Sequence, residues 1–328
     1  MNAAIFYLTQ NTEVRRVYLK TSLYFLFKNF NDKYKYPVII LHEGDYDTVS
    51  QTDIIMSIRA SCRSLVSFRA LDPDDFKLPS HIDAERMTAC INTKATSYWR
   101  NDKYRMMCRW WMIHFSKYAK SYDYAMRLDD DSIIEEPIKN DLFSWMDEKK
   151  LLYSSNFVHM DCGICCYGMK KFFMKNFKDT ESQNKLNKIF VEQKINMKDF
   201  RFYHFRKLLS INEKPLPDLS EEFKLDSPLI YYNNFFITKT SFWLKPEVQK
   251  IVEEIDKDGS IFYYRWGDAP LQSLVVLLLA KESEVDRCVF KYSKRMQREA
   301  FLGNDKIYHS FMPERYDQSS CVSEGRPS

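Results

Sequence analysis

Short apolar runs alternate with amphipathic stretches through the first 130 residues of the chain. The runs with the length of buried strands lie at 3–8, 37–41, 65–68 and 122–128. The stretches with apolar residues at mainly helical spacing lie at 14–27, 54–58 and 100–118. Strands that alternate with helices predict an α/β fold with a mainly parallel sheet covered on both faces.

The pattern is less regular after residue 130. Residues 172–205 are rich in Lys and aromatic side chains, and we expect them to be helical. Residues 212–228 contain three prolines among mixed charges, which is typical of a surface loop. The remaining expected elements are a strand at 229–238 and helices at 247–255 and 268–281.

Composition narrows the class of protein. The chain has 328 residues with 24 Phe and 21 Tyr, which excludes a disordered chain, and 7 Gly, which excludes a collagen-like one. A net charge of +4 is too small to indicate nucleic-acid binding by itself. No basic leader and no apolar run of about 20 residues is visible, so we expect a soluble, cytoplasmic protein without a membrane span.

Cysteine usage fits the same expectation. Eight cysteines in a large chain without a secretory signal favour reduced thiols. Cys162 and Cys165 have C-x-x-C spacing, but no second pair stands at zinc-ribbon distance. Ordinary thiols are therefore expected there, with a structural metal or redox site as the alternative.

Three acidic residues, Asp129, Asp130 and Asp131, directly follow the apolar run at 122–128. Ligands of open α/β sheets bind at the carboxyl ends of strands, and aspartates there can hold a hard divalent cation. Such a cation would bridge the phosphates of a nucleotide and neutralise a leaving diphosphate. The alternative is a solvated acidic turn.

A second candidate is the block Arg265-Trp266-Gly267-Asp268, which precedes an apolar helix. Asp268 stands at a plausible helix N-cap, so it could serve only as a cap. A carboxylate at a loop–helix junction can equally orient a sugar hydroxyl. The sequence leaves both readings open.

A third candidate is Tyr104-Arg105-Met106-Met107-Cys108-Arg109, on an apolar helix. Buried arginines need partners, which a phosphate or the protein's own acids could provide. The phosphate-binding loops of P-loop NTPases and Rossmann dehydrogenases are absent from the sequence, as are the hydrolase and zincin motifs.

These motifs resemble those of glycosyltransferase family 15, the fungal α-1,2-mannosyltransferases. Residues 262–273 are similar to the family signature F-x-Y-E-R-W-G-D-A-P-V-H-S, and 104–109 to Y-R-H-M-C-R. Residues 127–131 fall where the family has R-V-E-P, and 233–237 where it has S-N-F-E-I. The resemblance covers 3–312, which implies one GT-A catalytic domain at 1–312. It divides into a nucleotide-sugar half (1–130) and an acceptor half (131–312), with a peripheral tail at 313–328.

The resemblance also implies a GT-A fold, a GDP-mannose donor, a Mn²⁺ cofactor with Mg²⁺ as a substitute, and retention of configuration. The implied catalytic residues are Asp268, Tyr104 and Arg265. The implied donor-binding residues are Thr9, Asn11, Arg109, Arg127 and Trp266. The implied metal ligands are Asp129, Asp131 and His309. The family's strand Glu, a proposed nucleophile, is Phe236 here, and D-x-D replaces E-P. Such departures fit a viral or otherwise divergent relative.

The sequence thus predicts a metal-dependent, retaining mannosyltransferase whose acceptor is a glycan or glycoprotein and not a nucleic acid. The alternatives are a catalytically degenerate sugar-binding protein of the same fold, favoured by Phe236, and a nucleotidyltransferase, which would need a Gly-rich loop near the first strand. Family members are Golgi membrane enzymes, so the Golgi lumen is the alternative location if the chain is a trimmed luminal domain. A viral relative would act in the host cytoplasm or in the virion.

Overall fold

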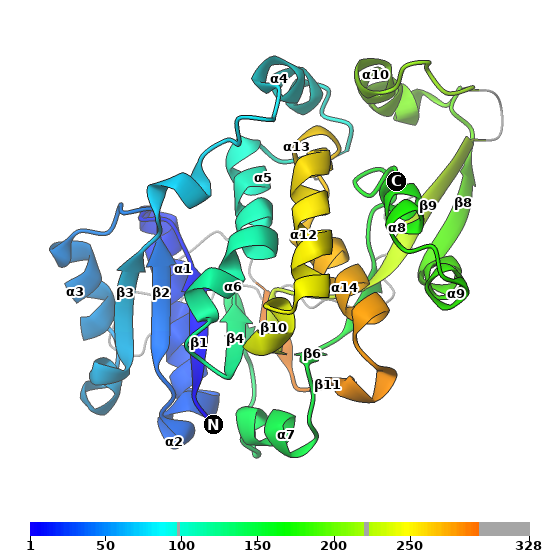
Figure 1. Ribbon diagram of the computed structural model, residues 1–328. Helices are drawn as coiled ribbons and strands as arrows, with labels where there is room; N and C mark the ends of the chain where they lie inside the picture. The colour runs from blue at the N-terminus through cyan, green and yellow to red at the C-terminus, as the bar shows by residue number, and fades with distance from the viewer. Residues whose placement is uncertain (97–98, 220–222, 295–328) are drawn as a thin grey trace.

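The computed structural model describes residues 1–96, 99–219 and 223–294. The strands of its central sheet are β1 (Ala3–Leu8), β2 (Val38–His42), β3 (Val66–Ala70), β4 (Tyr124–Leu128), β6 (Tyr153–Ser155), β10 (Phe235–Lys239) and β11 (Val285–Arg287). Their order across the sheet is β11-β6-β10-β4-β1-β2-β3 (Figure 1).

The sheet is mixed but mainly parallel. β1 is parallel to both β2 and β4, β2 is parallel to β3, and β11 is parallel to β6. β10 is antiparallel to its neighbours β4 and β6. The α/β fold predicted from the alternating pattern is confirmed, with the first four strands within two residues of their expected positions.

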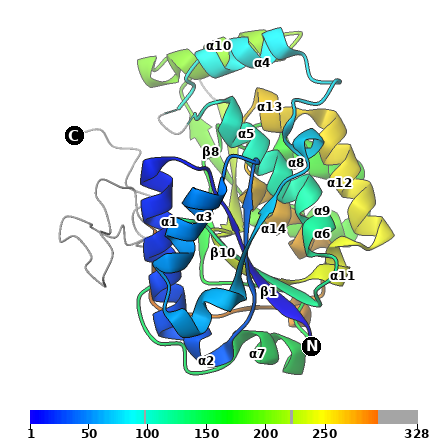
Figure 2. The same cartoon turned by 90° about the vertical axis from the view of Figure 1, so that its left-hand side faces the viewer.

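Alternate residues of the strands serve two hydrophobic clusters, one on each face of the sheet. On β1, Ile5 and Tyr7 join one cluster and Phe6 joins the other. The helices that contribute to the Ile5 cluster are α1 (Glu13–Leu26), α3 (Thr48–Met56) and α7 (Leu142–Glu148). Figure 2 shows β1 and β10 between α1 on one side and α6 and α12 on the other.

The second cluster is larger and takes most of the remaining helices. They are α4 (Ala84–Asn92), α5 (Asp102–Arg109), α6 (Phe115–Ala119), α8 (Met169–Asn176), α9 (Thr180–Ile189), α10 (Tyr203–Asn212), α11 (Thr240–Trp243), α12 (Pro246–Asp258), α13 (Ser260–Tyr263) and α14 (Asp268–Leu279). α5 continues into α6 through a π-helical stretch, which confirms the long buried helix expected at 100–118. The short α2 (Asp32–Tyr34) lies beside the first cluster.

Two expectations for the middle of the chain are wrong. The segment expected to be helical at 172–205 is interrupted: α8 ends at residue 176 and α9 at residue 189, and a strand, β8 (Phe190–Ile195), follows α9. β8 pairs with β9 (Phe223–Tyr231), so the expected loop at 212–228 contains the first residues of a strand. β9 also pairs with β7 (Val158–Met160), giving a small antiparallel sheet beside α8 and α9 (Figure 1). Pairing between residues 28 to 38 positions apart overrides the local composition here.

A separate two-stranded sheet lies outside the central sheet. β5 (Ser132–Ile134) pairs with β12 (Tyr292–Lys294), which is antiparallel to it. None of the helices in the described ranges has the length and hydropathy needed to cross a membrane. The boundaries expected at residues 130 and 312 stay predictions, and the tail at 313–328 lies outside the described residues.

Candidate functional site

The acidic triplet lies at the carboxyl end of β4 and reaches the neighbouring strand β1. Asp130 Oδ2 accepts a hydrogen bond from Thr9 Oγ1, which follows β1, at 2.7 Å. Asp130 Oδ1 accepts one from Arg15 Nη1, in the first turn of α1, at 2.7 Å. The two strand ends therefore meet at one polar edge, the place where open α/β sheets bind ligands.

Asp129 is surrounded by donors. Its Oδ1 accepts from Arg127 Nε at 3.0 Å, and its Oδ2 accepts from Asn234 Nδ2 at 2.6 Å and from Lys294 Nζ at 2.8 Å. Burial alone would raise the pKa of this carboxyl, but the charges of Arg127 and Lys294 hold it below its ordinary value. Asp129 is therefore an ionised group that already has its counter-charges.

Asp131 is less well satisfied. Its Oδ1 lies 3.5 Å from Lys294 Nζ and has no hydrogen-bond partner among the residues that the structure describes. Burial raises the pKa of Asp131 to about 7, against the opposing charge of Lys294. A buried acceptor without a donor is costly, and such atoms are typical of sites that bind a ligand.

Arg127 joins this triplet to α14. Its Nη1 lies 2.5 Å from Asp268 Oδ2, which also accepts from Asn233 Nδ2 at 2.8 Å. Its guanidinium stacks 3.9 Å from the Trp111 ring centre. Gly267, not Asp268, is the N-cap of α14, so the cap-only interpretation of Asp268 is wrong. Asp268 instead holds the start of α14 against β4 through Arg127.

Tyr104 and Arg265 form a second pair near the start of α14. Arg265 Nη2 donates to Tyr104 Oη at 3.2 Å, and the guanidinium lies 5.0 Å from the centre of the Tyr104 ring. Arg265 has φ of 63°, the left-handed region that a residue with a side chain rarely adopts. Its buried Nε has no partner in the described residues. Strain and an unused donor together are typical of a functional position.

The C-x-x-C segment lies beside Arg265. All cysteines in the described residues are free, which agrees with the expected thiols; Cys321 lies outside these ranges. A hydrogen bond from Cys162 lowers the pKa of the Cys165 thiol to about 6, and the charge of Arg265 acts in the same direction. Cys165 is buried.

Arg109 does not join the cluster. Its Nε and Nη2 bind Asp256 Oδ1 and Oδ2 at 2.6 and 2.7 Å, and its Nη1 lies 2.9 Å from His114 Nε2. The carboxylate of Asp256 on α12 thus pairs with this guanidinium, so Arg109 needs no phosphate. Pairing with the protein's own acids is one of the two alternatives that the sequence leaves open. Arg105 likewise points to backbone carbonyls, those of Phe262 and Trp99.

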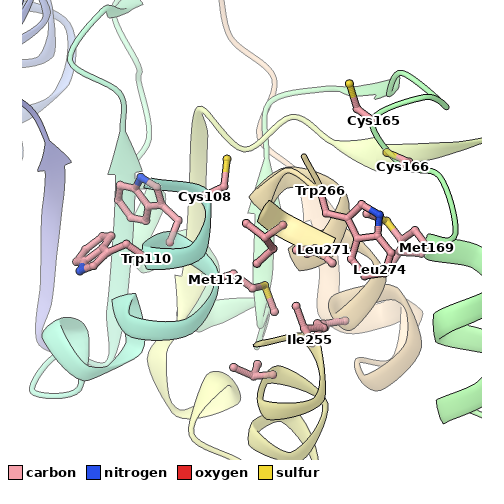
Figure 3. Packing of buried hydrophobic residues seen from close by; sticks show 14 of the residues in the cluster. Cys108, Trp110, Met112, Cys165, Cys166, Met169, Ile255, Trp266, Leu271 and Leu274 are labelled. Atoms are coloured by element: carbon pink, nitrogen blue, oxygen red, sulfur yellow. The ribbon is translucent and has the colours of Figure 1, made fainter. Parts of the chain in front are cut away.

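Trp266 and Asn11 are also held by structural contacts. Trp266 is buried beside Met169 and Leu274, and its Nε1 donates to the Tyr167 carbonyl at 2.9 Å (Figure 3). Asn11 Nδ2 donates to the Asp45 carbonyl at 2.7 Å, which fixes the turn after β1. His309, expected as a metal ligand, lies outside the described residues.

Phe236 occupies β10 directly opposite Arg127 of β4. Its ring is buried, 5.5 Å from the Tyr153 ring and 6.1 Å from the Trp111 ring. The position that the resemblance gives to a carboxylate is therefore part of an aromatic layer under the guanidinium. No acidic group replaces it within β10.

Sequence reasoning missed Arg15 and Lys294. Arg15 is one of many basic residues in an amphipathic helix, so nothing local distinguishes it. Lys294 reaches the triplet only because β12 pairs with β5, which places Lys294 opposite Ser132. Asn233 and Asn234 had a signal, since they stand in the segment that resembles S-N-F-E-I.

A family model described as glycolipid 2-alpha-mannosyltransferase matches residues 1–293. O-glycoside alpha-1,2-mannosyltransferase homolog 5 of Schizosaccharomyces pombe is 23% identical over 300 residues, 87% of this chain and 68% of that protein. Glycolipid 2-alpha-mannosyltransferase of Saccharomyces cerevisiae is 21% identical over 286 residues, 85% of this chain and 57% of that protein. The chain thus spans about 57% to 68% of these relatives.

Solved structures agree on the fold. The mannosyltransferase Ktr4p from S. cerevisiae in complex with GDP has a TM-score of 0.68 at 22% identity, covering 89% of this chain and 70% of that one. The Mn/GDP form of core-mannan synthase A from Aspergillus fumigatus has a TM-score of 0.69 at 20% identity, covering 89% and 74%. These likenesses confirm the GT-A fold that the resemblance implied.

Proposed function

Because the chain belongs to the glycolipid 2-alpha-mannosyltransferase family, we propose that it transfers mannose from GDP-mannose to a hydroxyl of a glycan or glycoprotein, forming an α-1,2 linkage with retention. The observation that carries the proposal is the Arg127 bridge, which joins the acidic triplet at the strand ends to Asp268 at the start of α14. The buried guanidinium of Arg127 thereby fixes the carboxylate of Asp129, which we assign to the donor side, relative to that of Asp268, which we assign to the acceptor side. Such fixed geometry is what transfer between two bound sugars requires.

The roles of the other residues follow from their positions. We assign Thr9 and Asn11, in the turn after β1, to the nucleotide side of the polar edge, because Thr9 contacts Asp130 there. Tyr104 and Arg265 present a hydroxyl and a guanidinium near the start of α14 and would orient the hydroxyls of the sugars. The contacts of Arg109 and Trp266 support structural roles for both, so we leave them out of the donor site.

Phe236 favours a front-face transfer over a covalent glycosyl-enzyme, because the position has no carboxylate to attack the sugar. In this transfer the bond between C1 and the phosphate oxygen breaks as the acceptor oxygen bonds C1 on the same face. The acceptor proton passes to the leaving phosphate, which ends as GDP. The protein's part is to hold both substrates and to offset the charge that develops on the diphosphate.

The Mn²⁺ expected from the sequence stays a prediction. A resident metal fits poorly here, because Lys294 Nζ lies 2.8 Å from Asp129 Oδ2 and 3.5 Å from Asp131 Oδ1, and these are two of the three residues assigned to the metal. A divalent ion there would be repelled by the ammonium at close range. In the described ranges, no three His, Cys, Asp or Glu side chains are arranged to hold a metal. No step of the transfer is therefore assigned to a metal.

The test is transfer itself. The chain is incubated with GDP-mannose and a methyl α-mannoside acceptor, and the product is digested with an α-1,2-specific mannosidase. We expect GDP and a mannosidase-sensitive disaccharide in equal amounts. Donor binding without any release of GDP would favour the sugar-binding alternative. Release of mannose 1-phosphate, the leaving group when GMP is transferred from GDP-mannose, would favour a nucleotidyltransferase. The cytoplasmic location stays a prediction that fractionation of the source cells can check.

A further inference from the structure

Lys294 is a cation built into the centre of the acidic triplet. β12 pairs with β5 so that Lys294 stands opposite Ser132, and Tyr292 Oη lies 2.6 Å from Ser132 Oγ, which ties the two strands together. The Lys294 ammonium is 2.8 Å from Asp129 Oδ2 and 3.5 Å from Asp131 Oδ1. Its side chain is 20% exposed, so the group is partly open to a ligand at the polar edge.

The ammonium faces two carboxylates, with Nζ 2.8 Å from Asp129 Oδ2 and 3.5 Å from Asp131 Oδ1, and these are its counter-charges. An ammonium has three N–H donors. Asp129 takes one of them, and the 3.5 Å approach to Asp131 is an ion pair outside good hydrogen-bond distance. Among the described residues, nothing takes the third N–H, which can therefore be donated to a phosphate oxygen.

We propose that Lys294 supplies the positive charge to the donor diphosphate in place of a divalent metal, so that donor binding and transfer by this chain are independent of metal. The inference rests on the proposed function. As the C1–O bond breaks, the electron pair moves to the diphosphate oxygen, and the ammonium donates a hydrogen bond to the phosphate that carries the new charge. The ammonium keeps its proton, and the acceptor proton still passes to the leaving phosphate.

Asp129 and Asp131 then act as positioning residues. Their carboxylates hold the ammonium at the strand ends, in the way that the triplet would otherwise hold a cation from solution. A divalent ion and the ammonium compete for the same two oxygens. Removing the ammonium should therefore weaken diphosphate binding and at the same time uncover affinity for a metal.

The experiment measures GDP binding by calorimetry in EDTA and in excess MnCl₂. The proteins compared are the wild type, Lys294→Ala, Lys294→His and the control Lys291→Ala. Lys291 is three residues away, 72% exposed and in a loose ion pair with Glu136 at 3.8 Å. We expect the wild type and Lys291→Ala to bind GDP equally in both buffers. Lys294→Ala should bind GDP about 10- to 100-fold more weakly in EDTA, the loss of one hydrogen bond to a charged group.

Lys294→His sharpens the test, because a neutral imidazole can join the two carboxylates as a metal ligand. We expect its GDP binding to become dependent on Mn²⁺. The electron paramagnetic resonance signal of free Mn²⁺ reports how much of the ion is unbound. Loss of this signal with the variant, and not with the wild type, would show that the ion enters the site. This measurement does not require transfer activity. It compares Mn²⁺ binding by the variant with Mn²⁺ binding by the wild type.

Two results would overturn the inference. One is GDP binding by the wild type that rises tenfold or more on adding MnCl₂. The other is Lys294→Ala that is folded and binds GDP in EDTA as tightly as the wild type. If the folded wild type binds no GDP in either buffer, the proposed function fails, and the inference that rests on it fails too. If it binds GDP only with MnCl₂, the inference alone fails. If Lys294→Ala does not fold, the wild-type comparison in EDTA and MnCl₂ still decides.

Discussion

Two ion networks, one around Arg109 and one around Arg127, differ in the polar atoms that they leave unsatisfied. In one, Arg109 binds both oxygens of Asp256 and lies against His114, and these contacts use all the terminal nitrogens of the guanidinium. In the other, Arg127 bridges Asp129, after β4, and Asp268, at the start of α14, beside an Asp131 oxygen that has no donor among the described residues. Burial and charge alone therefore do not indicate a site. Position at the strand ends and unmet polar atoms separate the second network from the first.

The largest expected effect is that of Arg127→Met. The change leaves Asp268 and Asp129 buried without their shared counter-charge, and breaking a buried pair in this way costs about 3–5 kcal/mol. We expect a large fall in the midpoint of urea unfolding and no measurable transfer at temperatures where the variant is still folded. Arg109→Met is the matched control. Its stability should fall as well, but GDP affinity should remain that of the wild type. Equal loss of GDP affinity in both variants would contradict the proposal that only the Arg127 network belongs to the donor site.

Asp268→Asn should have the next largest effect, on catalysis. The amide keeps the shape of the side chain but removes the charge that faces Arg127, so Arg127 and the substrate hydroxyl lose their alignment. We expect kcat to fall about 10²-fold, the magnitude of a misplaced reacting group. Initial rates at saturating GDP-mannose measure it. Full activity of a correctly folded Asp268→Asn would show that the carboxylate serves the structure alone.

Asp256→Asn tests the other network. It removes the carboxylate that binds Arg109 at two atoms, and a lost hydrogen bond to a charged group costs about 1.5–3 kcal/mol. We expect this loss in the free energy of unfolding, measured in urea, with kcat and KM unchanged at 25 °C. A change in KM for GDP-mannose would instead support the prediction from the sequence that Arg109 binds the donor.

The smallest effect concerns pH and His114. Burial lowers the pKa of His114 below 6.5, assisted by the charge of Arg109 and opposed by Asp75 and Asp256. The unfolded chain therefore takes up a proton at a pH where the folded chain does not, and stability present above pH 6.5 is lost as the pH falls. His114→Gln should flatten this part of the curve of unfolding free energy against pH. Parallel curves for the two proteins would refute the assignment.

Local pattern was sufficient for the part of the fold that is regular. β1 to β4 are apolar runs bounded by polar turns, and the acidic triplet follows one of them directly, so both could be predicted. Asp268 could be singled out from its block, although its contact with Arg127 could not. β8 could not be predicted, because its apolar pattern is too weak without the partner strand. The strand expected at 229–238 is wrong in its bounds, since it joins the end of β9 to β10. Lys294 looks like any other lysine until β12 is paired.

The pairing of β12 with β5 also has a consequence for biosynthesis. Asp129 and Lys294 are separated by 165 positions in the chain, so a ribosome completes the carboxylates long before it makes the ammonium. Until β12 emerges and docks on β5, the nascent chain presents the triplet without this neutralising charge and repels a nucleotide diphosphate. The donor site that we propose would therefore be completed late in synthesis, after the central sheet already has the strands that support it.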